Sequence, residues 1–147
     1  MDKNQTVAAM VRARKSHETQ MAKIEASLSG EKVENPAPLL KTSCDFGKWL
    51  YSPENHIEEI LGELFYVKLE KAHAQWHAEY ARIYHIFYKE EKKGFFSSLL
   101  GSHKIDDLEI DKAKLYYMEL EVTTKELLHV FGSCERRISA MSDTKFH

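Results

Sequence analysis

The sequence predicts an all-α protein: a bundle of the antiparallel four-helix type with one additional short helix that carries a cysteine motif. Apolar residues recur every three or four positions along most of the chain, which is the spacing of one helix face. No stretch alternates apolar and polar residues for long enough to predict a strand. All three prolines lie between Pro36 and Pro53, so long stretches lack the residue that breaks helices most strongly.

Length and composition limit the possible classes of protein. The 147 residues fit a single domain, residues 1–147, and 43% apolar residues suffice for one core without disulfides. The net charge of −2, with both signs interspersed, argues against a nucleic-acid partner. No apolar run reaches the roughly 18 residues of a membrane helix, and the N-terminus lacks a signal peptide. We therefore expect a cytoplasmic protein without a membrane partner.

The first predicted helix covers Lys3–Leu28 and ends at Ser29-Gly30. One of its faces carries His17 among apolar neighbours. That face consists of Met10, Arg14, His17, Met21, Ile24 and Leu28. Residues 31–41 contain two prolines and are expected to form a connection.

A short helix is predicted over Cys44–Tyr51, with Thr42 or Ser43 as its N-cap. A long third helix is expected to begin at Ser52-Pro53 and to run to Glu91, because proline is favoured at the first helical position. Its inner face is predicted to consist of Tyr66, Leu69, His73, Trp76, Tyr80, Ile83 and Phe87, with His77 and Tyr84 beside it.

Residues 95–104 are predicted to form a loop with an apolar centre, Phe95–Leu100, that packs onto the bundle or onto a partner. The last helix is expected over Asp106–Met141. Its regular inner stripe is Leu120, Thr124, Leu127, Phe131, Cys134, Ile138 and Met141. Because this helix is long for one small bundle, we expect it to extend past the core or to help form a homodimer.

The strongest local signal for a functional site is the pair His73 and His77. Histidines at i and i+4 lie one above the other on a helix, so both can reach one metal ion. Alone, such a pair is weak evidence. Here both residues face the predicted core beside Trp76, and buried histidines without partners would lose several hydrogen bonds.

Two further residues complete a candidate zinc site. His17 lies on an inner helix face, and Cys44 opens the short helix between the histidine-bearing helices. Free amides and the helix dipole at such a position favour a thiolate, and zinc accepts nitrogen and sulfur ligands in a tetrahedron. The predicted metal ligands are therefore His17, Cys44, His73 and His77.

The run Cys44–Leu50, CDFGKWL, resembles the Cys-x-Leu/Phe-Gly-x-Trp-Leu/Tyr segment of the chemoreceptor zinc-binding (CZB) domain family. His17, His73 and His77 match the order of that family's three histidines. The resemblance implies a zinc site of three histidines and one cysteine in a helical bundle that commonly dimerises. It also implies a sensory role in bacterial chemoreceptors and diguanylate cyclases, in response to zinc or to oxidants at the cysteine.

The chain shows no methyl-accepting coil and no cyclase domain, so we expect a sensory domain that stands alone and signals by contact. Its expected partner is a chemoreceptor or a diguanylate cyclase. An enzyme is disfavoured, because four protein ligands leave no open position on a zinc ion and the inner faces offer few acids for a di-iron site. A metal-free helical adaptor is the alternative hypothesis.

Other conspicuous residues have simpler interpretations. Trp49 is expected to anchor the short helix in the core, and Gly47 to permit close approach to a neighbouring helix. Asp45 either accepts a histidine N–H or faces solvent. Cys134 is expected to be a packing residue. The remaining histidines are expected at the surface or rim: His56, His85, His103, His129 and His147.

Overall fold

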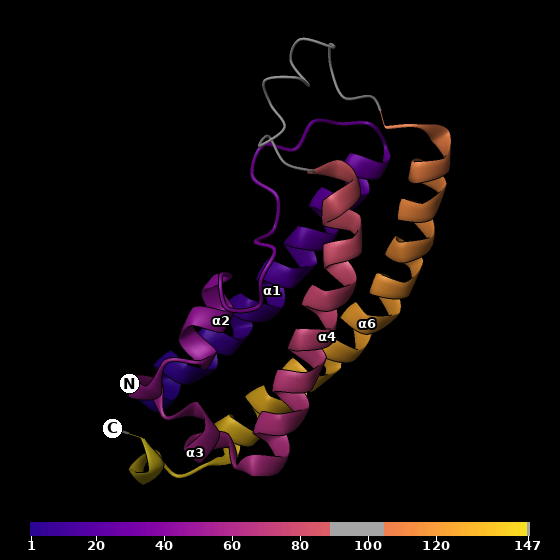
Figure 1. Ribbon diagram of the computed structural model, residues 1–147. Helices are drawn as coiled ribbons and strands as arrows, with labels where there is room; N and C mark the ends of the chain where they lie inside the picture. Colours follow the sequence, from indigo (N-terminus) through magenta and orange to yellow (C-terminus); the bar gives the residue numbers. More distant parts are fainter. Residues whose placement is uncertain (89–104, 147) are drawn as a thin grey trace.

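Three long helices form the frame of the protein (Figure 1). The computed structural model describes residues 1–88 and 105–146. The long helices are α1 (Lys3–Leu28), α4 (Glu63–Phe87) and α6 (Asp107–Ala140). No strand occurs within the described residues, so the predicted all-α class is confirmed. The limits predicted for the first and last helices are confirmed to within one residue.

Helix α6 packs against both other long helices. Helices α1 and α4 run in the same direction and α6 runs opposite to them, so both chain ends lie at one end of the bundle (Figure 1). This arrangement arises because the connection after α1 returns along the bundle before α4 begins. The predicted antiparallel packing therefore holds between α6 and each of its two neighbours.

The short helix α2 (Asp45–Leu50) follows that connection. Its N-cap is Cys44, whose sulfur accepts a hydrogen bond from the Gly47 amide. The prediction of Thr42 or Ser43 as the cap was wrong, because the chain enters the helix one residue later and the sulfur takes the place of the usual oxygen.

The predicted long third helix is interrupted, which corrects the expectation of a continuous helix from Pro53. A 3₁₀ turn, η1 (Pro53–Asn55), and a short helix, α3 (Ile57–Leu61), precede α4. The interruptions coincide with positive φ angles of 50° at His56 and 83° at Gly62. Those values lie outside the helical region, so the backbone turns at each of the two residues.

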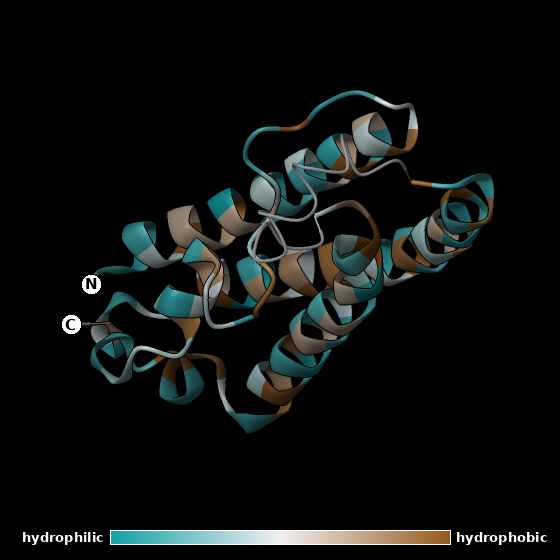
Figure 2. Cartoon of the chain, turned by 45° about the horizontal axis from the view of Figure 1, so that its top comes forward, coloured by the Kyte–Doolittle hydropathy of each residue, from teal (hydrophilic) through white to brown (hydrophobic). Residues whose placement is uncertain are grey.

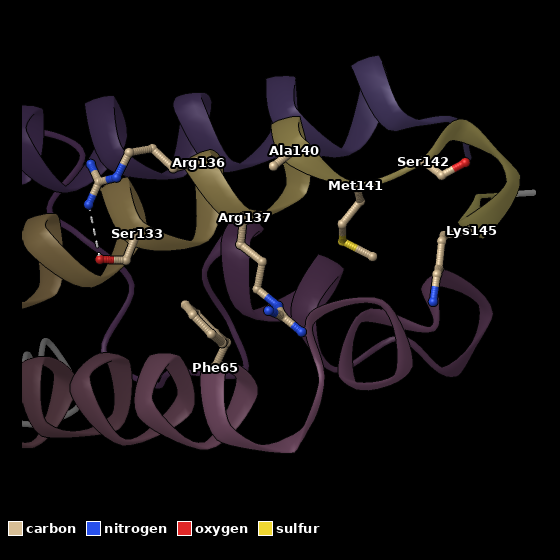
Figure 3. Close-up of a pocket in the computed structure, with 8 residues that line it drawn as sticks. All are labelled: Phe65, Ser133, Arg136, Arg137, Ala140, Met141, Ser142 and Lys145. Atoms are coloured by element: carbon tan, nitrogen blue, oxygen red, sulfur yellow. Dashed lines mark hydrogen bonds between the residues drawn. The ribbon is translucent and has the colours of Figure 1, made fainter.

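An arginine of α6 stabilises the junction between α3 and α4. Arg137 Nε donates to the carbonyl oxygen of Leu61 at 2.7 Å, and its guanidinium lies 4.5 Å from the centre of the Phe65 ring. Figure 3 shows Arg137 reaching from α6 towards this junction, beside Phe65. The contact satisfies a carbonyl that the end of α3 leaves free.

The core runs along the meeting faces of the long helices. Trp76, Tyr80 and Phe131 are among its largest fully buried side chains. The Trp76 indole donates to Thr124 Oγ1 at 2.9 Å, which joins α4 to α6 through a polar contact inside the core. Polar and apolar residues are interspersed along each long helix (Figure 2). This pattern is typical of helices with one buried face.

Helix α4 ends at Phe87 with Tyr88 as its C-cap, four residues before the predicted end at Glu91. The apolar loop Phe95–Leu100 lies outside the described residues. The last described residues are a 3₁₀ turn, η3 (Asp143–Lys145), and Phe146. Of the described helices, none combines the length and apolar character needed to cross a membrane.

Candidate metal centre

Three histidines from two helices meet inside the bundle. His17 comes from α1, and His73 and His77 come from successive turns of α4. All three are buried, with exposed fractions of 3%, 0% and 5%. One ring nitrogen from each lies within 4.8 Å of the others. The expected convergence of these side chains is therefore seen in the structure.

Aromatic rings enclose the cluster. The His17 ring lies 4.9 Å from the Trp76 ring between centroids, and Phe46 of α2 lies 4.9 Å from His73. Phe46 also packs edge-on against Phe131 of α6, at 4.9 Å. These rings exclude water from the histidines and limit their rotation.

Backbone carbonyls orient two of the three imidazoles. His17 Nδ1 lies 2.8 Å from the Ala13 oxygen, and His77 Nδ1 lies 3.2 Å from the Leu39 oxygen. A carbonyl oxygen accepts but cannot donate, so Nδ1 carries the proton in both rings and Nε2 keeps its lone pair. An outer hydrogen bond of this kind fixes the ring of a metal-binding histidine.

Two ring nitrogens of the cluster have no hydrogen-bond partner. Among the described residues, three buried side-chain polar atoms lack one: Gln20 Oε1, His73 Nδ1 and His77 Nε2. An unpaired buried polar atom costs about 1–3 kcal/mol. His77 Nε2 carries a lone pair that a metal ion could accept, because Nδ1 of that ring donates to the Leu39 oxygen. His73 can offer only one of its nitrogens to a metal ion, either the unpaired Nδ1 or the Nε2 that faces the Cys44 sulfur.

The Cys44 sulfur lies at the edge of this cluster. Sγ is 3.3 Å from His73 Nε2, 3.2 Å from the Gly47 nitrogen and 3.5 Å from the Lys41 oxygen. With usual zinc bond lengths and tetrahedral angles, a sulfur and a nitrogen on one zinc ion lie roughly 3.5 Å apart. The sulfur is outside the mutually close set formed by the three histidines.

Burial keeps the histidines neutral. Loss of hydration lowers the pKa of His73 to about 2 and that of His77 to about 4, and it also lowers the pKa of His17. Burial raises the pKa of the Cys44 thiol. Neutral imidazoles are ready to donate to a metal, whereas the thiol must lose its proton when zinc binds.

A tight turn presents Cys44 to the cluster. A Cβ atom added to Gly47 would lie 1.6 Å from the Lys41 oxygen, so the position admits no side chain. Gly47 was expected to permit close approach to a neighbouring helix. It instead permits close approach of α2 to the turn that precedes it.

The donor set therefore fits zinc: three buried neutral imidazoles, two orphaned nitrogens and an adjacent thiol. A cavity of about 650 Å³ lies at the C-terminal end of α6, beside Arg136 and Lys145 (Figure 3). None of the four candidate ligands lines this cavity.

Comparison with known proteins gives an independent result. Residues 17–84 match the family model of the chemoreceptor zinc-binding domain, CZB. The chain contains a CZB domain. The matched segment begins at His17 and includes Cys44, His73 and His77, while α6 lies outside it. Comparisons with curated proteins and with solved structures give no match. The resemblance inferred from the CDFGKWL motif is thus confirmed, and the CZB description names zinc binding but no reaction.

The remaining sequence predictions have mixed outcomes. Asp45 is exposed, and carbonyl oxygens of Ala13 and Leu39 take the role considered for it. Trp49 is half-buried and packs against the core from its edge. Cys134 is fully buried, as predicted. His56, His85 and His129 are exposed, while His103 and His147 lie outside the described residues.

Sequence reasoning missed the residues around the site. Nothing marks the Leu39 carbonyl as a histidine partner, because any residue offers that oxygen. Glu70, which pairs with Lys41 and Tyr51 beside Cys44, had a usable signal. It precedes His73 by three residues and so occupies the same face of α4.

Proposed function

We propose that this chain binds one zinc ion through His17, Cys44, His73 and His77 and acts as a cytoplasmic sensory module. The observation that carries the proposal is the buried cluster itself: three imidazoles with nitrogens within 4.8 Å and a cysteine sulfur 3.3 Å from one of them. The CZB match supports the choice of zinc.

Metal content and affinity test the proposal directly. The purified protein should carry about one zinc per chain, and His73→Ala or His77→Ala should abolish tight binding. His85→Ala is the matched control, because His85 lies on α4 but is exposed. A protein that is purified without metal and shows no thermal shift on addition of zinc would instead be a metal-free helical adaptor.

The proposed signal is a change in the metal site. Zinc would link α1, the Cys44 turn and α4, so its loss should loosen these elements from one another. Oxidation of Cys44 would remove one ligand with a similar effect. Mild oxidant should release zinc from the wild type. Retention of zinc by a protein whose Cys44 is shown to be oxidised would contradict this mechanism.

A second copy of the chain is the proposed structural partner. The outer face of α6 exposes Leu108, Leu115, Met118 and Val122, which are 61–69% exposed. Their spacing of seven, three and four residues is typical of a coiled-coil seam. Light scattering should therefore report a dimer, and Met118→Glu should yield a monomer that still binds zinc.

The proposed output is contact with a chemoreceptor or a diguanylate cyclase. The support is the CZB match, whose description names chemoreceptors. Titration of a purified cytoplasmic chemoreceptor fragment with the zinc-loaded and zinc-free forms tests this step. Equal affinities of the two forms, or no binding by either, would mean that a chemoreceptor is not the output partner. The same titration would then be made with a diguanylate cyclase.

A further inference from the structure

The connection before α2 is attached to one face of α4 by a row of polar contacts. Tyr80 donates its hydroxyl to the Ala37 oxygen at 2.8 Å, and His77 Nδ1 lies 3.2 Å from the Leu39 oxygen. Further along, His73 meets Cys44, and Glu70 meets Lys41. The α4 residues that make these contacts are Glu70, His73, His77 and Tyr80, which are spaced by three or four along one helix face.

Glu70 contacts one residue before α2 and one residue after it. One carboxylate oxygen accepts from Lys41 Nζ at 2.6 Å, and the other accepts from the Tyr51 hydroxyl. Lys41 begins the turn that leads to Cys44, and Tyr51 is the C-cap of α2. Lys41 Nζ also lies over the Tyr51 ring, 5.4 Å from its centre, so the lysine contacts both Glu70 and Tyr51.

The backbone of Lys41 links the contact with Glu70 to the Cys44 sulfur. Its carbonyl oxygen lies 3.5 Å from Cys44 Sγ and occupies the space that Gly47 leaves open. A shift of Lys41 therefore moves the surroundings of the sulfur directly. The side chains of Lys41 and Glu70 are 39% and 27% exposed, so the pair is accessible to water yet held at the bundle surface.

We infer that Glu70 is a positioning residue for the zinc site, which holds Cys44 against His73 by bonding Lys41 and Tyr51 on either side of α2. The inference rests on the proposed zinc binding. Two of the contacts along α4 are made by proposed ligands, so they change when metal arrives or leaves. The contacts of Glu70 do not involve a ligand side chain, and they keep the cysteine turn in place while zinc is absent.

Glu70→Ala tests the inference, with zinc affinity and the sulfur-to-cobalt charge-transfer band of the cobalt(II)-loaded protein as readouts. We expect about a tenfold loss of zinc affinity and a weaker sulfur band, because a partly exposed, charge-assisted contact is removed. Glu79→Ala is the matched control. Glu79 lies on the same helix, but its carboxylate bonds Gln75 and Thr123 on the side facing α6. It should leave both readouts unchanged.

A double-mutant cycle identifies the route of the effect. If Glu70 acts through the cysteine, Glu70→Ala should cost no further zinc affinity in a Cys44→Ala background. Tyr51→Phe and Lys41→Met remove one contact each and serve if Glu70→Ala does not fold. Wild-type affinity and band in these variants, an equal loss in Glu79→Ala, or an undiminished loss without Cys44 would each overturn the inference. A wild type that binds neither metal would overturn the proposed function as well.

Discussion

The two cysteines of this chain are both buried but occupy different environments. Cys44 is 8% exposed and caps a six-residue helix, where its sulfur meets an amide, a carbonyl oxygen and an imidazole. Cys134 is 0% exposed within the inner stripe of the 34-residue α6. Burial raises its pKa to about 11. The two thiols therefore differ mainly in their neighbours: Cys44 lies beside a candidate metal-binding histidine, whereas Cys134 lies in the core stripe of a long helix.

The largest expected difference between the cysteines is in zinc affinity. Cys44→Ala should weaken zinc binding about a hundredfold, because it removes a ligand outright. Cys134→Ala should leave the affinity unchanged and lower the free energy of unfolding by about 1 kcal/mol through a small cavity. Competition with a chelator and urea unfolding measure the two effects. Equal zinc affinities in both variants would show that the two cysteines do not differ in their contribution to zinc binding.

Gly47→Ala should disrupt the environment of Cys44 without touching its sulfur. The new methyl group would meet the Lys41 oxygen, so the turn must open, at a cost of about 2 kcal/mol of stability and a clear loss of zinc affinity. Gly132→Ala in α6 is the control, since its methyl group would meet only the flexible end of Arg136 at 3.3 Å. That variant should be neutral or slightly stabilised. A zinc affinity unaffected by Gly47→Ala would show that the turn adapts.

Alkylation of the metal-free protein should separate the two thiols by rate. We expect Cys44 to react about tenfold faster than Cys134, because its thiolate is stabilised by a helix-start amide and its sulfur is nearer to solvent. Zinc should protect Cys44 alone. Mass spectrometry of timed iodoacetamide reactions provides the rates, and protection of both cysteines by zinc would indicate a general tightening of the fold.

A pH dependence of the metal-free protein should separate its buried histidines from the exposed ones. The three buried histidines have pKa values below the ordinary 6.5, so below that pH the unfolded chain binds protons that the folded chain does not. The contribution of these histidines to the free energy of unfolding should be fully present above pH 6.5 and should decrease as the pH is lowered to 5. Urea midpoints measure this fall. His73→Leu should reduce it and the exposed His85→Gln should not. A flat profile for the wild type would contradict the burial of neutral histidines.

Much of this arrangement could be predicted from the sequence, because it follows from helix periodicity. His73 and His77 had to share a face, and α1 ended where Ser29-Gly30 placed its end. The break at His56 was missed because a left-handed histidine is rare and no local residue type demands it. The break at Gly62 had a usable signal, since glycine is the residue that most readily takes a positive φ. Glu70 and the Leu39 carbonyl were missed because their partners lie in a connection whose path is set by tertiary contacts.

Trp76 gives the bundle a built-in optical reporter. Its indole is fully buried, stacks on Tyr80 and lies about equally close to His17 and His77, at centroid distances of 4.9 and 5.0 Å. Metal binding or protonation at either imidazole alters the charge beside the ring, and with it the energy and yield of tryptophan emission. The other tryptophan, Trp49, lies half-buried at the edge of the core, so Trp49→Phe leaves a single tryptophan, which lies beside the histidine cluster. The emission of Trp76 should therefore report zinc binding at the proposed site in real time, without an attached dye.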